Sequence, residues 1–279
     1  MSRIGSYAIT AGMLLLALLG CGGGGWSGAD PITGITATNF KYGQLATLTL
    51  TGNALDNVIK LSSDKCLSVT LGAIESSSRR QATCIVAATG PIQFTVKSSA
   101  DYVVYNTVLT APEPQVTLVT SLGSVVIELN PTAAPITVKN FLAYVNQSPS
   151  FYSGTLFHRV ISGFMAQGGG FTTGMTQKSG LSPAITLESQ NGLLNLRGAV
   201  AMARTNAADS ATSQFFVNLV DNAFLNYASA NSPGYAVFGK VVSGMDVIDL
   251  MATKPTQTLG TNENVPVTDI TITSASQTQ

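Results

Sequence analysis

The sequence predicts a mainly β protein of two domains. The chain has 279 residues, which exceeds one ordinary domain and allows two, each with its own core. Short runs of β-branched and apolar residues recur between positions 31 and 111, with Gly, Asn, Asp and Ser between them. Two prolines within residues 112–114 then favour an extended, stiff connection. These observations place one domain at residues 31–111, a linker at 112–114 and a second domain at 115–279.

The composition excludes several classes of function. Only 10% of the residues are charged, and 14 basic residues balance 14 acidic ones without a basic cluster beyond Arg79 and Arg80. Nucleic acid is therefore not an expected partner. The sequence has one histidine, His158, and its three cysteines include no C-x-x-C pair. We expect no metal site and no thiol redox chemistry.

Residues 1–20 are typical of a signal peptide. Arg3 precedes an apolar stretch from Ala11 to Leu19, which is shorter than the ~20 residues that a membrane-spanning helix requires. The run from Leu18 to Cys21 resembles a bacterial lipobox, in which Cys21 would be lipidated and would begin the mature chain. Residues 21–30 would then be a flexible Gly-rich tether. The alternative is a plain cleaved signal, with Cys21 present by chance.

This N-terminus predicts a lipid-anchored protein in the cell envelope of a Gram-negative-type bacterium, facing the periplasm. Two acyl chains hold a protein stably on a membrane, whereas one does not. An Asp after the lipidated cysteine retains such proteins at the inner membrane, and this chain has Gly22 there. We therefore expect the outer membrane rather than the inner one.

Residues 31–111 predict an immunoglobulin-like β-sandwich. Strand-like runs cover residues 45–51, 66–71, 92–97 and 102–109, and no long pattern of 3.6-residue period appears. With Cys21 assigned to lipid, Cys66 and Cys84 remain as a pair that would form a disulfide in an oxidising compartment. The alternative is two buried free thiols. We expect this domain to be a spacer or a partner-binding module.

The second domain begins with two strand-like runs between Val116 and Leu129. A helix is predicted near residues 136–146, because Val138, Phe141, Leu142 and Val145 follow the i, i+3, i+4, i+7 spacing of one apolar face. A second helix is predicted near residues 244–252.

Three blocks of the second domain carry a family resemblance. They are residues 157–169 (FHRVISGFMAQGG), residues 197–204 (RGAVAMAR) with 210–218 (SATSQFFVN), and residues 235–248 (YAVFGKVVSGMDVI). In this order, the blocks resemble the signature regions of cyclophilins over about residues 116–273. The resemblance implies a closed eight-stranded antiparallel β-barrel capped by two helices. It also implies an enzyme, a peptidyl-prolyl cis-trans isomerase, whose reaction requires no cofactor.

The same resemblance assigns roles to individual residues. Arg159 would be the catalytic cation that faces the prolyl nitrogen, and Gln167 would hydrogen-bond the substrate backbone nearby. The substrate-binding residues would be Phe164, Met165, Gln167, Ala203, Arg204, Gln214, Phe216, Phe224, Leu225 and Tyr235. Phe224 and Tyr235 stand where many eukaryotic members have Trp and His, so we expect weak or no cyclosporin binding.

Simpler interpretations compete with some of these roles. Arg159 on spacing alone is more simply explained as the partner of a structural carboxylate, and only the matched block favours catalysis. His158 is better explained as a packed strand residue than as a catalytic one. The leading hypothesis is an isomerase that acts on exported or unfolded Pro-containing polypeptides and assists their folding, as a monomer. The alternative is a non-catalytic module that binds Pro-containing peptides.

Overall fold

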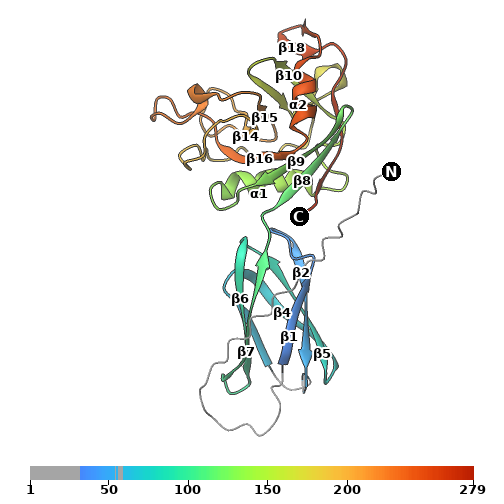
Figure 1. The fold of residues 1–279 in the computed structure, drawn as a ribbon, viewed down its shortest axis with the longest axis vertical. Helices are drawn as coiled ribbons and strands as arrows, with labels where there is room; N and C mark the ends of the chain where they lie inside the picture. Colours follow the sequence, from blue (N-terminus) through green and yellow to red (C-terminus); the bar gives the residue numbers. More distant parts are fainter. Residues whose placement is uncertain (1–31, 54, 56–58) are drawn as a thin grey trace, which may run out of the picture.

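The computed structural model of this chain describes residues 32–53, 55 and 59–279. The signal peptide, Cys21 and the Gly-rich tether lie outside these residues. Figure 1 shows a β-sandwich and a barrel domain, joined by the extended segment at residues 112–114. Within the described residues, no helix has the length and apolarity required to cross a membrane.

The sandwich consists of a four-stranded and a three-stranded antiparallel sheet. The first has the order β1-β2-β5-β4, with β1 at Ile32–Thr38, β2 at Leu45–Gly52, β5 at Arg79–Val86 and β4 at Cys66–Ser76. The second has the order β3-β6-β7, with β3 at Ile59–Ser63, β6 at Gly90–Ser98 and β7 at Val103–Ala111. This is the strand order of constant-type immunoglobulin domains.

The core of the sandwich follows from alternation along its strands. In β2, Ala46, Leu48 and Leu50 are fully buried, whereas the threonines between them are not. A disulfide joins Cys66 of β4 to Cys84 of β5, with their Cα atoms 5.6 Å apart. The bridge therefore lies within one sheet, whereas the conserved disulfide of antibody domains joins the two sheets.

The second domain is a closed antiparallel barrel of eight strands, which confirms the predicted fold class. Its order is β10-β11-β15-β14-β16-β9-β8-β19. The bounds are β8 Gln115–Thr120, β9 Gly123–Leu129, β10 Thr155–Ile161, β11 Met165–Gly168, β14 Ala199–Met202, β15 Phe215–Asn218, β16 Val237–Ser243 and β19 Thr271–Gln277. The C-terminal strand β19 pairs with both β8 and β10, and so closes the barrel.

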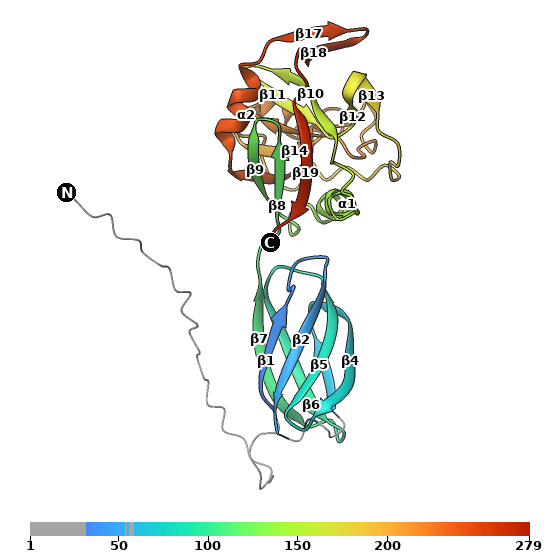
Figure 2. The same cartoon turned by 90° about the vertical axis from the view of Figure 1, so that its right-hand side faces the viewer.

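Two α-helices cover the barrel on different sides, α1 at Pro135–Val145 and α2 at Met245–Ala252 (Figure 2). The apolar face of α1 packs into the barrel core, where the Phe141 ring lies 5.5 Å from the Phe215 ring. The N-terminus of α1 has no capping side chain of its own. Glu188 supplies one, since its carboxylate accepts hydrogen bonds from the backbone N–H groups of Ile136 and Thr137 at 3.0 and 2.8 Å.

Shorter elements complete the barrel domain. Two small hairpins are formed by β12 (Phe171–Thr172) with β13 (Thr176–Gln177) and by β17 (Thr256–Leu259) with β18 (Asn262–Pro266). Two 3-10 turns lie at Thr173–Met175 (η1) and Ala223–Leu225 (η2).

The end of the barrel domain contacts the sandwich. The amide of Gln277 donates a hydrogen bond to the carbonyl of Tyr42 at 3.0 Å and accepts one from the Gln44 amide at 3.1 Å. The ammonium of Lys41 donates to the carbonyl of Thr278 at 3.0 Å. The side chain of Tyr42 also packs against the barrel core.

Candidate active site

The register of four neighbouring strands brings the predicted site residues together. Arg159 of β10 is directly opposite Gln167 of β11, and Gln167 is opposite Phe216 of β15. Phe216 is in turn opposite Ala201 of β14. Directly opposed residues of an antiparallel sheet share one face, so these four form a row across the outer wall of the barrel. Met165, two residues before Gln167, lies on the same face.

This row borders a hollow of about 180 Å³. Its apolar part comes from Phe164, Met165, Phe216, Leu225 and Tyr235, and its polar part from Arg159, Gln167, Ala203 and Arg204. Met165, Phe216 and Leu225 are buried, so the apolar surface is formed before any ligand arrives. The hollow therefore suits a small apolar ring with a polar group beside it.

Arg159 is the cation at this hollow. Its side chain is half-buried, and within the described residues it forms no ion pair with a carboxylate. The interpretation as a partner of a structural carboxylate is therefore not supported. A guanidinium keeps its charge at every physiological pH and presents its donors in a rigid plane. Beside it, the amide nitrogen of Gln167 donates to the side-chain oxygen of Gln214 at 2.9 Å, which orients both amides.

Aromatic rings form the rim of the hollow. The rings of Phe164 and Phe224 stack with centroids 5.6 Å apart, and Phe224 remains 72% exposed. The Tyr235 ring meets Phe216 edge-on at 5.5 Å. The guanidinium of Arg204 lies 4.7 Å from the centre of the Tyr235 ring, and its Nε donates to the carbonyl of Gly234 at 2.9 Å. Arg204 thus braces the tyrosine and is not free to act as a second mobile cation.

A network of asparagine side chains fixes the wall that carries Leu225. The amide of Asn195 donates to the carbonyl of Leu225 at 3.1 Å, and Asn218 donates to the side-chain oxygen of Asn195 at 3.2 Å. Asn222 donates to Asn218 at 2.7 Å and to the carbonyl of Phe164 at 3.0 Å. Asn195, Asn218 and Asn222 are buried, so these bonds hold the turn η2 firmly against the barrel. Sequence reasoning missed this network, whose only signal is Asn218 at the end of an apolar run.

Two predicted residues lie just outside the hollow. Gln214 reaches it only through its bond to Gln167, and Phe224 stands on the rim through its stack on Phe164.

The backbone N–H of Ala203 already donates to the carbonyl of Gln214 at 2.9 Å. A peptide bound along this edge would therefore use the carbonyl of Ala203 rather than its N–H.

A neighbouring hollow of about 410 Å³ lies on the other side of Arg159 and was not predicted. It involves His158, Gln214, Phe171, Met175 and the tip of the hairpin β17–β18 at residues 261–263. His158 is 5% exposed, and its Nδ1 has no hydrogen-bond partner. Burial lowers the pKa of His158 to about 4, and the adjacent positive charge of Arg159 acts in the same direction. The imidazole is therefore neutral at pH 7, so Arg159 is the only charge of this pair.

The fold and site together define a class: a closed antiparallel barrel whose outer wall carries a preformed apolar hollow with a guanidinium beside it. Comparison with known proteins identifies the family. Residues 115–277 match the model of the cyclophilin type peptidyl-prolyl cis-trans isomerase family.

Individual relatives agree with this match. The chain is 57% identical over 147 residues to a peptidyl-prolyl cis-trans isomerase of Acinetobacter baylyi, covering 53% of this chain and 76% of the relative. It is 51% identical over 159 residues to peptidyl-prolyl cis-trans isomerase B of Escherichia coli, covering 56% and 95%. Among solved structures, a cyclophilin-type isomerase of Cryptosporidium parvum, crystallised with the dipeptide Ala-Pro, is 26% identical with a TM-score of 0.50. That match covers 59% of this chain and 99% of the other.

The chain therefore belongs to the cyclophilin-type peptidyl-prolyl cis-trans isomerases. It is an enzyme that interconverts the cis and trans forms of X-Pro bonds, as the resemblance of its three sequence blocks predicted. The matched region is the barrel domain alone, and the sandwich lies outside it.

The buried His158 makes stability depend on pH. Because its pKa is lower in the folded protein, about 4, than the ordinary 6.5, its contribution to stability is complete above pH 6.5 and is lost as the pH falls toward 4. We predict that the free energy of unfolding of the barrel falls by about 2 kcal/mol between pH 7 and pH 5. Urea titrations followed by circular dichroism measure this.

The matched variant for this measurement is His158→Gln. The sequence has no other histidine, so the variant should lose most of the dependence over this pH range. An equally steep dependence in the variant would show that other groups cause it.

Proposed function

We propose that this isomerase acts on exported or unfolded polypeptides in the cell envelope, held there by a lipid on Cys21, and that Arg159 is its catalytic cation. The sandwich serves as a spacer or client-recruiting module, and the protein acts as a monomer. The observation that carries the catalytic part is the guanidinium of Arg159, which has no carboxylate partner in the described residues and borders the apolar hollow.

The chemistry of the bond explains why a cation suits this position. Rotation about an X-Pro bond faces a barrier of ~20 kcal/mol, because resonance gives the C–N bond double-bond character. A guanidinium that donates to the prolyl nitrogen favours a pyramidal nitrogen, which cannot conjugate with the carbonyl. No proton transfer, nucleophile or cofactor takes part in this step. Catalysis rests on binding the twisted amide more tightly than either planar isomer.

The remaining side chains position the substrate for this step. The proline ring occupies the apolar hollow over Met165 and Phe216, and the amide of Gln167 holds the adjacent backbone. Half-burial strengthens the interaction of Arg159 with the substrate, because fewer water molecules screen it. The competing hypothesis of a non-catalytic binding module is disfavoured, since the relatives are named isomerases and the hollow is lined by Arg159 and most of the predicted substrate-binding residues.

Removing the cation tests the catalytic assignment. We predict that Arg159→Ala lowers kcat/KM in a protease-coupled assay with a Pro-containing tetrapeptide on the order of 100-fold, as expected when a preorganised donor is lost from the transition state. The control is Arg79→Ala, which removes an exposed arginine of the sandwich that forms an ion pair with Glu75. Equal rates for wild type and Arg159→Ala would refute the assignment.

The proposed pocket also bears on cyclosporin. Phe224 has no ring N–H, and the Tyr235 ring is braced by Arg204. An inhibitor that accepts a hydrogen bond from an indole N–H at the position of Phe224 loses that hydrogen bond here. We therefore propose weak or absent cyclosporin binding.

The envelope location rests on two observations from different parts of the chain. The first is the signal-like stretch at residues 1–20 with its lipobox-like end at Cys21. The second is the disulfide between Cys66 and Cys84, a bond that persists in oxidising compartments such as the periplasm. Both support export, and Gly22 favours the outer membrane.

Lipidation is tested at the cysteine itself. We predict that Cys21→Ser abolishes palmitate labelling in cells and moves the protein from the membrane fraction to the soluble fraction, because the acceptor thiol is gone. Cys66→Ser with Cys84→Ser serves as the control and should retain the label. Persistent labelling of Cys21→Ser would contradict the anchor.

A further inference from the structure

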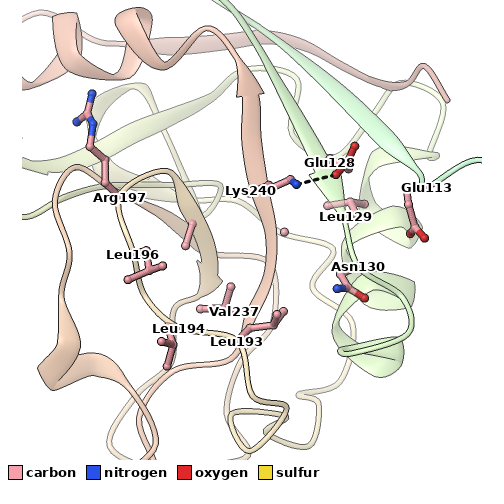
Figure 3. A pocket seen from close by; sticks show the side chains of 12 residues that line it. Glu113, Glu128, Leu129, Asn130, Leu193, Leu194, Leu196, Arg197, Val237 and Lys240 are labelled. Atoms are coloured by element: carbon pink, nitrogen blue, oxygen red, sulfur yellow. Dashed lines mark ion pairs between the residues drawn. The ribbon is translucent and has the colours of Figure 1, made fainter.

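A third hollow lies on the barrel wall formed by β9, β14 and β16, outside the prolyl site (Figure 3). It encloses about 470 Å³, within the range typical of ligand sites. Leucines from the loop before β14 lie along one side of it, and acidic residues lie along the other side, beyond β16. We call it the leucine groove, defined by Leu193, Leu194, Leu196, Ala199, Val237 and Glu113.

The leucine groove exposes large apolar side chains to solvent. Leu194 and Leu196 are 51% and 50% exposed, although they flank Asn195, which is buried. The buried asparagine fixes the loop through its hydrogen bonds to Leu225 and Asn226, so the two leucines are held outward. Apolar side chains that are gathered around a hollow and held in place indicate a binding surface.

The groove and the prolyl site lie against one apolar cluster. Ala199 and Val237 of the groove belong to the same buried cluster as Met165, Phe216 and Leu225 of the prolyl hollow, and Leu193 packs against that cluster. The two hollows therefore share one apolar wall. A chain that places its proline in one can extend over the other.

The charges around the groove indicate which segments it would prefer. Lys240 pairs with Glu128 at 3.1 Å, and Arg197 pairs with Asp249 at 2.7 Å, so these charges are balanced locally. The carboxylate of Glu113 accepts a hydrogen bond from the hydroxyl of Thr89 at 2.8 Å and has no cationic partner in the described residues. One negative charge therefore remains at this edge of the groove, where a Lys or Arg of a ligand would be attracted.

We infer that the leucine groove is a second binding site for unfolded polypeptides, which takes an extended apolar segment flanked by Lys or Arg and requires no proline. The inference goes beyond the proposed function, because binding here involves neither Arg159 nor the prolyl hollow. The groove would hold an unfolded polypeptide close to the prolyl hollow, while the X-Pro bonds of that polypeptide enter the hollow one after another. Occupancy of both sites by one chain would raise the effective concentration of its prolines.

The test uses the full chain and a fluorescein-labelled, proline-free peptide, Lys-Leu-Val-Leu-Lys, measured by fluorescence anisotropy. Wild type should bind the peptide, and Leu194→Asp with Leu196→Asp should lower the affinity at least tenfold. Because Asp adds a charge that attracts the basic peptide, a loss reports the apolar contact. The matched control is Val267→Asp, which changes a residue that is equally exposed, at 51%, and outside the groove. It should bind like wild type.

Two further measurements separate the groove from the prolyl site. Glu113→Gln should weaken peptide binding a few-fold at low salt and not at 0.5 M NaCl, since screening removes the attraction. The double leucine variant should keep tetrapeptide isomerisation within twofold of wild type, but lose most of its acceleration of the Pro-limited refolding of a reduced, carboxymethylated ribonuclease. Arg159→Ala should lose activity on both substrates and still bind the proline-free peptide.

Several outcomes would overturn the inference. The first is that wild type does not bind the peptide, and the second is that the double leucine variant binds it as tightly as wild type does. The third is that Ala-Pro displaces the peptide, and the fourth is that the double leucine variant also loses its tetrapeptide isomerisation. An active Arg159→Ala would instead refute the proposed catalytic role and leave the groove unaffected.

Discussion

The site depends on one structural constraint, the cross-strand register that aligns Arg159, Gln167, Phe216 and Ala201 across β10, β11, β15 and β14. A shift of one residue in any of these pairs would turn a strand's outward side chains into the barrel core. Closure of the barrel through β19 leaves no free edge in these strands and therefore opposes such shifts. The cation and the apolar hollow are thus placed by backbone pairing, before any substrate is present.

Much of the fold could be predicted because its local signals agree with its tertiary structure. The helix α1 follows from an apolar face that the barrel does bury, and β2 follows from clean alternation of apolar residues and threonine. The sandwich strands β1, β3 and β5 were not predicted. The strand β3 has only five residues, of which only Ile59 is fully buried, so its signal is short. The strand β5 begins with two arginines, which are not typical of a strand that pairs with neighbours on both sides. The capping of α1 by Glu188 could not be predicted either, because the helix and Glu188 are distant in sequence.

The site was predicted through the family resemblance of its sequence blocks, and composition alone would not have located it. Phe164, Met165 and Phe216 are apolar strand residues that would ordinarily be assigned to a core. The hollow beside His158 was missed, because it requires the hairpin tip at residues 261–263 to fold back over β10. The leucine groove was also missed, because the loop of Leu194 and the linker residue Glu113 are distant in sequence and line one hollow only in the folded chain.

The central claim is that the planar guanidinium of Arg159, and not only its positive charge, lowers the barrier to rotation. The most direct measurement is NMR exchange between the cis and trans signals of an Ala-Pro peptide in the presence of wild type or Arg159→Lys. The lysine keeps the charge but loses the rigid, planar arrangement of donors. Our account predicts peptide binding within a few-fold of wild type and a catalysed exchange rate at least tenfold lower. An exchange rate equal to that of wild type would contradict it.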